Sequence, residues 1–525
     1  MKGTHCVRLL KIGPFASLAL ILLWLSGCAS LPSLEGRSES TALHLQDARQ
    51  TQLGDTFRPQ VDLHPGKSGI YPLDDAWDAF AARLLLAERA EKTLDVQYYI
   101  WRNDKTGRLM LSALLDAADR GVRVRFLLDD LNSRPLEGVL FHLHAHPNIE
   151  VRLFNPFMQR NSRIWGFITD FDRANRRMHN KSFTADNQAT IVGGRNIGDG
   201  YFGTGDGLLF ADLDVLAIGP VVQEVSLDFD HFWASQSAYP LDFVADVSAK
   251  RERYAPQSIA AMMSSQEEVY EYLNSVMDTS HMQALLDGSM PFEWANTIMV
   301  SDDPGKGLGH AHGGQLITHQ LRKVIGEPEH YFELVSPYFV PTRAGTEALI
   351  EYAERGVEIT ILTNSLAATD VAIVHAGYAK WRKPLLEAGI RIFEMRRLPT
   401  NGEPESDERL ARFGSGAASL HAKTFAIDGE RVFVGSFNFD PRSVALNTEL
   451  GFVIESERLA QRIDDTFSER MPYMTYELKL SSSGRIYWLE RNPGEVIRHD
   501  VDPNTTLFKR ASVRVLSWLP IDWLL

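Results

Sequence analysis

Two stretches of the chain carry the same reactive side chains at the same spacing. The first contains His179, Lys181, Asp186, Gly193 and Asn196, and the second contains His421, Lys423, Asp428, Gly435 and Asn438. In extended chain, side chains two residues apart point to the same face, so each histidine lies beside its lysine. An imidazole beside an ammonium suits a nucleophile or a proton carrier next to an oxyanion. The candidate catalytic residues are therefore His179, Lys181, Asp186, His421, Lys423 and Asp428.

The elements that must position these residues are also repeated. Residues 93–101 are rich in β-formers, residues 107–121 carry apolar side chains at helical spacing, and residues 122–130 alternate as a strand does. The same order returns at residues 331–340, 344–356 and 357–365. Both predicted helices end in Arg-Gly-Val, with a glycine suited to a helix C-cap. The sequence therefore predicts an α/β protein built by tandem duplication.

The length of 525 residues exceeds what one hydrophobic core usually organises. The apolar fraction is ordinary, so the chain is expected to fold into domains. We expect a signal peptide at 1–28, a polar tether at 29–73, a first domain at 74–245, a helical connector at 246–300, a second domain at 301–475 and a C-terminal segment at 476–525.

The first thirty residues have the composition of an export signal. A basic start precedes an apolar run from about Phe15 to Leu25, which is too short for a comfortable membrane span. The residues up to Cys28 resemble a bacterial lipoprotein cleavage box, which implies acylation of the Cys28 thiol; an uncleaved anchor is the alternative. This resemblance predicts a membrane-associated lipoprotein facing the periplasm. The absence of aspartate at Ala29 and Ser30 favours the outer membrane over the inner.

The overall charge narrows the choice of partners. A formal net charge of −14 disfavours long-range attraction to nucleic acid, so any phosphate must bind in a local cationic pocket. The only cysteines are Cys6 and Cys28, which excludes a disulfide or cysteine-based metal site in the body of the chain.

Residues 507–525 mix basic, tryptophan and aliphatic side chains, which is typical of an interfacial helix; packing against the second domain is the alternative.

The duplicated motif, with its trailing glycine and asparagine, is similar to the signature of the phospholipase D superfamily. The likeness runs from about Asp74 to Met474. Residues 170–183, 192–199, 361–378 and 435–443 further resemble the bacterial cardiolipin synthase branch, and most closely its C type. The resemblance implies two phospholipase D-type α/β domains, each a mixed sheet flanked by helices, with one active site at their pseudo-twofold interface.

The resemblance also implies roles for the motif residues. One histidine, for which His179 is favoured over His421, attacks phosphorus, while the other exchanges protons with the departing and incoming alcohols. Phosphate oxygens would be bound by Lys181, Asn196, Lys423 and Asn438. Asp214 and Glu449 would orient the histidines, with Asp212 as a rival to Asp214. For Asp186 and Asp428 a structural role, bracing the turn after each strand, is the stronger alternative. No metal and no cofactor is expected.

The implied activity is a phosphatidyltransferase that makes cardiolipin. Phosphatidylglycerol is the expected acceptor and phosphatidylethanolamine the expected donor, with a second phosphatidylglycerol as the alternative donor. The expected partners are these phospholipids and the membrane surface, without nucleic acid, and any protein partner is left open. Three alternatives are a phospholipase D that produces phosphatidic acid, a nuclease, which the acidic balance disfavours, and a non-catalytic scaffold, which would have no need for two intact motifs.

Overall fold

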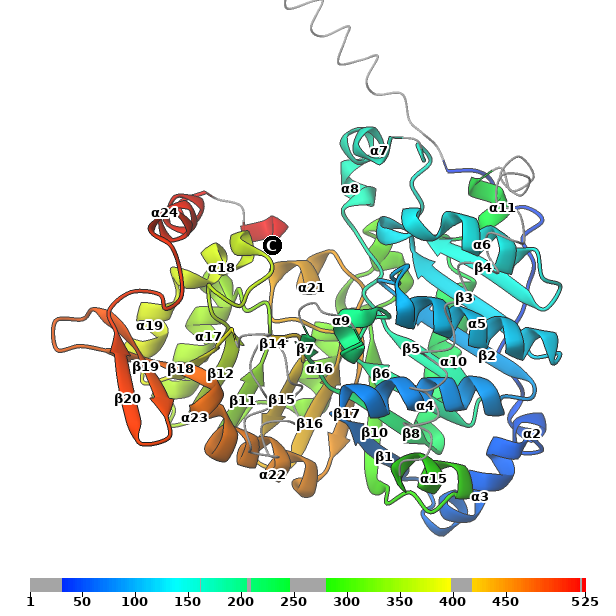
Figure 1. The fold of residues 1–525 in the computed structure, drawn as a ribbon, viewed down its shortest axis with the longest axis horizontal. Helices are drawn as coiled ribbons and strands as arrows, with labels where there is room; N and C mark the ends of the chain where they lie inside the picture. Colours follow the sequence, from blue (N-terminus) through cyan, green and yellow to red (C-terminus); the bar gives the residue numbers. More distant parts are fainter. Residues whose placement is uncertain (1–30, 161, 205–208, 246–279, 398–417, 520–521) are drawn as a thin grey trace, which may run out of the picture.

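The computed structural model describes residues 31–160, 162–204, 209–245, 280–397, 418–519 and 522–525 (Figure 1). The predicted signal peptide at 1–28, including Cys28, lies outside the described residues. Most of the predicted connector at 246–300 also lies outside them.

The first half of the chain forms one mixed sheet. Its hydrogen-bonded strand order is β9, β4, β3, β2, β5, β6, β8, β1. The bounds are β1 (Ser68–Leu73), β2 (Thr93–Tyr98), β3 (Arg123–Asp129), β4 (Ile149–Phe154), β5 (Ser182–Ala185), β6 (Ala189–Gly193), β8 (Asp214–Ile218) and β9 (Ala238–Pro240). Strands β2, β3 and β4 are parallel, because the helices α5 (Lys105–Asp119) and α6 (Glu137–His144) connect them.

The second half repeats this arrangement in the order β18, β13, β12, β11, β15, β16, β17, β10. The bounds are β10 (Glu293–Ser301), β11 (Tyr331–Val335), β12 (Glu358–Asn364), β13 (Arg391–Met395), β15 (Thr424–Ile427), β16 (Arg431–Gly435), β17 (Leu450–Glu455) and β18 (Thr475–Leu480). The parallel strands β11, β12 and β13 are connected by α17 (Thr342–Glu354), α18 (Ala372–Ala379) and α19 (Arg382–Glu387). The predicted duplication and fold class are confirmed.

Helices cover both sheets, and a cluster of buried hydrophobic side chains joins one sheet to the other. The helix α4 (Ala76–Arg89) packs on the first sheet, and its N-cap Asp75 accepts hydrogen bonds from the backbone N–H groups of Trp77 and Asp78. Between the halves, Val192 and Val215 pack in one cluster with Val432 and Phe452. Further helices are α8 (Phe171–Ala174), α9 (Asp199–Phe202), α10 (Pro220–Trp233), α11 (Leu241–Val244), α16 (Ile317–Ile325), α21 (Pro441–Ala445), α22 (Glu457–Asp465) and α23 (Met471–Met474).

The segment predicted to be a tether, residues 29–73, is largely folded from residue 45 onward. It contains α2 (Leu45–Ala48), α3 (Gln52–Leu63) and β1. Leu53 and Phe57 are buried in the first core, and β1 pairs with both β8 and β10, which joins the two sheets. The tether prediction was wrong because few apolar residues of this segment face the core, so its periodicity is weak.

Two other predicted boundaries shift. The connector ends in α15 (Ser280–Asp287) and then in β10, so the second sheet starts before residue 301. The C-terminal segment extends the second domain through β19 (Ile486–Asn492), β20 (Glu495–His499) and α24 (Leu507–Leu516). Buried Arg382 anchors this segment, with ion pairs of 2.7 Å to Glu394 and 3.0 Å to Asp502.

Candidate active site

Two histidines, one from each half of the chain, are held across the domain interface. His179 and His421 lie in extended chain just before β5 and β15, rather than within those strands. The backbone N–H of His179 donates to the carbonyl oxygen of Thr448 over 2.9 Å, and that of His421 donates to Ala211 over 2.8 Å. Strand β14 (Ala418–Leu420) adds to this contact by pairing with β7 (Leu209–Ala211) of the first half. Each histidine segment is therefore positioned by the opposite half.

The carboxylates that hold the two imidazoles also come from the opposite halves. The Nδ1 atom of His179 lies 2.8 Å from Glu449 Oε2, and that of His421 lies 2.5 Å from Asp212 Oδ2. Both carboxylates are buried. Ser436 and Ser443 donate to the two oxygens of Glu449 over 2.5 and 2.8 Å. A carboxylate on Nδ1 fixes the tautomer and leaves Nε2 for chemistry, so a complete site needs both halves.

Asp214, which was expected to orient a histidine, instead contacts two arginines. Its buried carboxylate forms ion pairs of 2.8 Å with Arg83 and 3.4 Å with Arg195. Strand register explains the difference: Gly193 pairs with Asp214, whereas Gly435 pairs with Gly451. The residues two positions before Asp214 and Gly451 are Asp212 and Glu449, which makes the rival Asp212 the structural counterpart of Glu449.

Both motif lysines are buried beside the histidines. The Nζ atoms of Lys181 and Lys423 donate to the backbone carbonyl oxygens of His179 and His421, and Lys423 Nζ lies 2.9 Å from His421 Nδ1. Burial lowers the pKa of Lys181 well below its ordinary value and also lowers the pKa of Lys423. Negative charge from a bound phosphate would favour the charged form of both lysines. The lysines are thus suited to an anionic ligand.

The histidines are held in their neutral form. Burial, and then the charge of Lys181, lowers the pKa of His179 well below its usual range, and burial with Lys423 lowers the pKa of His421. Burial alone would raise the pKa of Asp212, but His421 and Lys423 outweigh it and hold that pKa below its ordinary value. A neutral imidazole has a free lone pair on one ring nitrogen. The site therefore combines a potential nucleophile with an ionised carboxylate.

The two motif asparagines differ in their contacts. Asn196 Oδ1 accepts from the backbone N–H of Ile100, and its Nδ2 donates to the hydroxyl of Tyr201, each over 3.0 Å. Asn438 is buried, and within the described part of the chain its Oδ1 has no hydrogen-bond partner. Phosphate binding by these asparagines stays a prediction.

Asp186 and Asp428 occupy turns after the motif strands. Their φ angles are 50° and 54°. Asp186 accepts backbone hydrogen bonds from residues 91, 92 and 93, and Asp428 accepts them from residues 329, 330 and 331. Since β5 and β15 separate these turns from the histidines, the geometry supports the bracing interpretation rather than direct participation in catalysis.

Aromatic side chains that the sequence interpretation missed lie against both imidazoles. The ring of Tyr99 lies 4.9 Å from that of His179, and the rings of Tyr201 and Phe210 each lie 5.2 Å from that of His421. Tyr99 follows β2 in a stretch rich in β-forming residues, and it resembles a core residue in the sequence. The feature that could have identified Tyr99 as a site residue is its position at the carboxyl end of β2, because parallel strands present functional side chains at that end.

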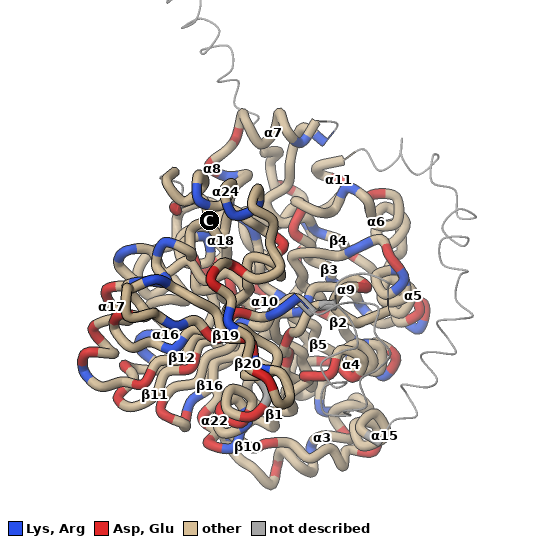
Figure 2. The backbone as a smooth tube through the Cα atoms, turned by 60° about the vertical axis from the view of Figure 1, so that its left-hand side comes forward, with Lys and Arg blue, Asp and Glu red and all other residues tan. Residues whose placement is uncertain are grey.

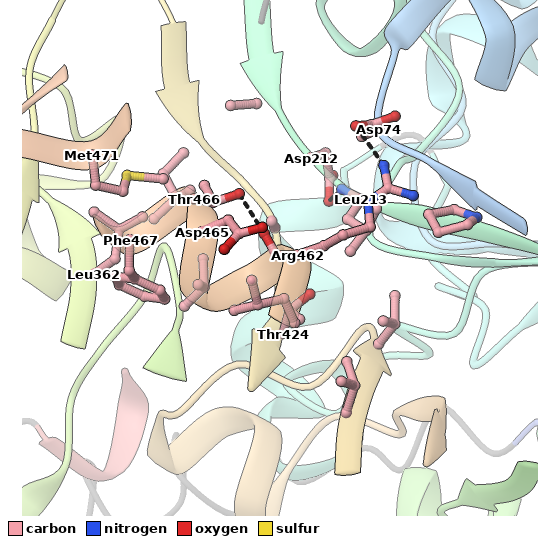
Figure 3. A pocket seen from close by; sticks show the side chains of 18 of the residues that line it. Asp74, Asp212, Leu213, Leu362, Thr424, Arg462, Asp465, Thr466, Phe467 and Met471 are labelled. Carbon is pink, nitrogen blue, oxygen red and sulfur yellow. Dashed lines mark hydrogen bonds and ion pairs between the residues drawn. The ribbon is translucent and has the colours of Figure 1, made fainter. Parts of the chain in front are cut away.

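Asp212 also lines a cavity of about 340 Å³ (Figure 3). Its walls are mostly apolar and include Leu420, Ala422 and Thr424. His421 and Lys423 alternate with these residues along the extended chain, so their side chains point to the opposite face. The cavity therefore borders the carboxylate that holds His421 but not the reacting side of the imidazole.

Known proteins match both halves of the chain. The family described as cardiolipin synthase, PLD-like domain, matches residues 85–233 and 321–471. Cardiolipin synthase C of Escherichia coli (strain K12) is 50% identical over 474 residues, covering 90% of this chain and 100% of that protein. A cardiolipin synthase of Oceanobacillus iheyensis is 26% identical over 421 residues, covering 79% of this chain and 72% of that one.

Among solved structures, phosphatidylserine synthase of Haemophilus influenzae Rd KW20 superposes with a TM-score of 0.55. The superposition covers 87% of this chain and 95% of that protein, at 13% sequence identity. At this identity the likeness shows a shared fold.

Proposed function

This chain belongs to the cardiolipin synthase family with phospholipase D-like domains, and we propose that it moves a phosphatidyl group from phosphatidylethanolamine to phosphatidylglycerol. The products are cardiolipin and ethanolamine. Membership of this family makes the chain a phosphatidyltransferase. The observation that carries the proposed mechanism is the pair of buried imidazoles, each held at Nδ1 by a carboxylate of the opposite half.

In the first step, Nε2 of His179 attacks the phosphorus of the donor. A nitrogen–phosphorus bond forms, the bond from phosphorus to the ethanolamine oxygen breaks, and the imidazolium of His421 gives its proton to that oxygen. The phosphate of the bound donor supplies the negative charge that favours the protonated form of His421. Glu449 stabilises the positive charge that His179 acquires.

In the second step, the acceptor hydroxyl of phosphatidylglycerol enters where ethanolamine left. His421 takes its proton, the hydroxyl oxygen bonds to phosphorus, and the bond to His179 breaks. Lys181 and Lys423 stabilise the charge on the phosphate oxygens during both steps. Water in place of the acceptor would give phosphatidic acid, which is the outcome of the hydrolase alternative.

Product analysis tests this proposal. The purified chain is incubated with phosphatidylglycerol, alone and with phosphatidylethanolamine that carries an isotopic label in its phosphatidyl group. Lipids are then identified by mass spectrometry. We expect labelled cardiolipin and released ethanolamine. Unlabelled cardiolipin alone would make phosphatidylglycerol the donor, and phosphatidic acid alone would make water the acceptor.

Similarity to cardiolipin synthases implies membrane association. Across the described ranges, no helix combines the length and hydropathy needed to cross a bilayer. Acylation of Cys28 and an outer-membrane location facing the periplasm remain proposals from the lipoprotein-like leader. An anchor at Cys28 would not by itself fix the orientation of the folded domains, so a second contact would be needed to hold the active site against the bilayer.

Two exposed apolar surfaces could supply that second contact. Helix α7 (Arg163–Thr169) of the first half exposes Ile164, Trp165 and Ile168 by 77%, 50% and 61%. Helix α24 of the second half packs Val513 inward but exposes Phe508 by 81%, and Trp518 just beyond it is 77% exposed. Both helices lie at the same edge of the molecule (Figure 1), and α24 contains the basic residues Lys509, Arg510 and Arg514; Lys and Arg positions are blue in Figure 2. Tryptophan and basic residues beside aliphatic ones suit the headgroup region of a phospholipid bilayer.

We expect the quadruple replacement of Ile164, Trp165, Phe508 and Trp518 by serine to weaken vesicle binding by about tenfold or more, because each buried apolar side chain contributes to binding. The measurement is co-sedimentation with vesicles containing phosphatidylglycerol, in a Cys28→Ser background so that no acyl chain contributes. The control is Leu63→Ser. The Leu63 side chain is 76% exposed, and its helix α3 lies at the edge of the molecule opposite to α7 and α24 (Figure 1). Equal binding by the quadruple variant and the control would refute this membrane surface.

A further inference from the structure

An acidic side chain, Asp370, lies on a loop fastened to the His421 segment, and its negative charge acts on Lys423, where it counteracts the lowering of the pKa of that lysine by burial. Asn364, at the end of β12, accepts from the backbone N–H of Leu420 and donates to its carbonyl oxygen, each over 3.0 Å. The Ser419 hydroxyl donates to the carbonyl of Ala368 over 3.1 Å. Since Leu420 directly precedes His421, the loop that carries Asp370 is held at the site.

Asp370 is paired with a tyrosine that approaches from the Asn438 side. The hydroxyl of Tyr338 lies 3.0 and 2.9 Å from the two carboxylate oxygens of Asp370 and donates to them. The Tyr338 segment is itself fixed to Phe439, because Val340 N–H donates to the Phe439 carbonyl over 2.8 Å. Phe439 follows Asn438. The Asp370–Tyr338 pair therefore lies between the His421 segment and Asn438.

The surroundings of this pair suit a cation. The carboxylate of Asp370 is exposed, so a substrate can reach it. Burial, and then the charge of Asp370, raises the pKa of Tyr338 well above its ordinary value, and Tyr201 and Tyr99 raise it further. These two tyrosines also contact the histidines, so the aromatic rings and the carboxylate belong to one region. Electron-rich ring faces attract ammonium groups.

A carboxylate near a phosphate site opposes the binding of an anion, unless the ligand also carries a positive charge. Phosphatidylethanolamine meets this condition, because two carbons separate its ammonium from the phosphodiester oxygen. The glycerol headgroup of phosphatidylglycerol carries no cation. The carboxylate thus distinguishes the two candidate donors by charge.

We propose that Asp370 and Tyr338 form a subsite for the ammonium group of the donor headgroup, with the unpartnered Oδ1 of Asn438 as a further acceptor. The lysines bind the phosphate, and Asp370 binds the ammonium of the same zwitterion. This inference rests on the proposed function. It assigns the choice of donor to particular residues.

The test compares donors in one reaction with the full chain. Phosphatidylethanolamine and phosphatidylglycerol carry different isotopic labels, and the ratio of the two kcat/KM values is read from the labelled cardiolipin. We expect Asp370→Asn to lower the ratio in favour of phosphatidylethanolamine by about tenfold or more, since a hydrogen bond to a charged group is lost. Asp370→Glu should restore part of the preference. Glu354→Gln, an exposed carboxylate on α17, is the matched control.

A purely structural role of Asp370 in holding Tyr338 predicts a different result. Rates with both donors would fall together in Asp370→Asn and in Tyr338→Phe, and the ratio of the two kcat/KM values would stay within twofold of the wild-type ratio in both variants. Such a result would overturn the subsite while leaving phosphatidylethanolamine as the donor. Failure of the proposed function is distinguishable, because the wild-type chain would then form no cardiolipin from either donor, or would form it from phosphatidylglycerol only, whereas failure of the subsite alone leaves a wild-type chain that uses phosphatidylethanolamine.

Inhibition by soluble headgroups gives a second readout. Phosphoethanolamine should inhibit the wild-type chain more strongly than glycerol 3-phosphate, and Asp370→Asn should remove that difference. Equal inhibition of the wild-type chain by both compounds would contradict the subsite.

Discussion

Replacement of His179 by asparagine is expected to lower cardiolipin formation by about a thousandfold or more while the chain remains folded. His179 is buried, neutral and fixed by Glu449, and the covalent step needs its free ring nitrogen. Asparagine retains a polar group facing the buried carboxylate, which limits the loss of stability. The rate is measured by mass spectrometry of the lipid products, and folding by circular dichroism and thermal melting.

His375 offers a matched control for this replacement. It is also a buried histidine, but its Nε2 contacts Arg382 at 2.7 Å on α19 rather than a carboxylate of the opposite half. His375→Asn should keep most of its activity per folded molecule. A folded His179→Asn chain with more than about a tenth of wild-type activity would show that the reaction does not pass through this imidazole.

Asp212→Asn and Asp214→Asn are expected to fail in different ways. Asp212 fixes the tautomer of His421, and loss of such a carboxylate typically lowers the rate by about 10²- to 10⁴-fold. Asp214 instead neutralises buried Arg83 and Arg195, so its replacement should cost about 3 kcal/mol of stability. The measurements are turnover per folded molecule and chemical denaturation.

These two variants test whether Asp212, as the structure shows, or Asp214, as the sequence suggested, is the carboxylate that orients His421 in catalysis. If Asp214→Asn lost more activity per folded molecule than Asp212→Asn, the pairing of Asp212 with His421 would not be the one used in catalysis. A similar effect of both replacements on stability alone would also contradict the expected difference.

The duplication was predictable because the motif residues and the secondary-structure pattern before them indicate the same repeat. The motif repeats at fixed spacing, and the strand–helix–strand order before it repeats as well. Both features come from local side-chain periodicity, which the sequence displays directly. Glu449 was also identified correctly as a residue that contacts a histidine, since few residues separate it from Asn438.

The partner of His421 required information that spacing along the chain does not carry. The segment after Asn196 is longer than its counterpart after Asn438, so the offset from the asparagine could not place the acid, and the family resemblance favoured Asp214 over Asp212. Pairing of Gly193 with Asp214 and of Gly435 with Gly451 would have aligned Asp212 with Glu449. Strand register depends on contacts between distant residues, which is why the assignment needed the structure.

The folding of residues 45–73 was missed for a similar reason. Only one side of α3 faces the core, through Leu53 and Phe57, and most of its other side chains are polar. Strand β1 gains its stability by pairing with β8 and β10, which are remote in sequence. The tyrosines at the site were missed because an aromatic residue near a buried strand normally indicates packing.

Identification of the covalent intermediate tests the account most directly. The full chain is mixed with phosphatidylethanolamine labelled in its phosphatidyl group, quenched at neutral or alkaline pH within the first turnover, digested and mapped by mass spectrometry. The mechanism predicts a labelled phosphatidyl group on the peptide that contains His179. A label on the peptide that contains His421 would reverse the two roles, and turnover without a labelled histidine would contradict the two-step transfer.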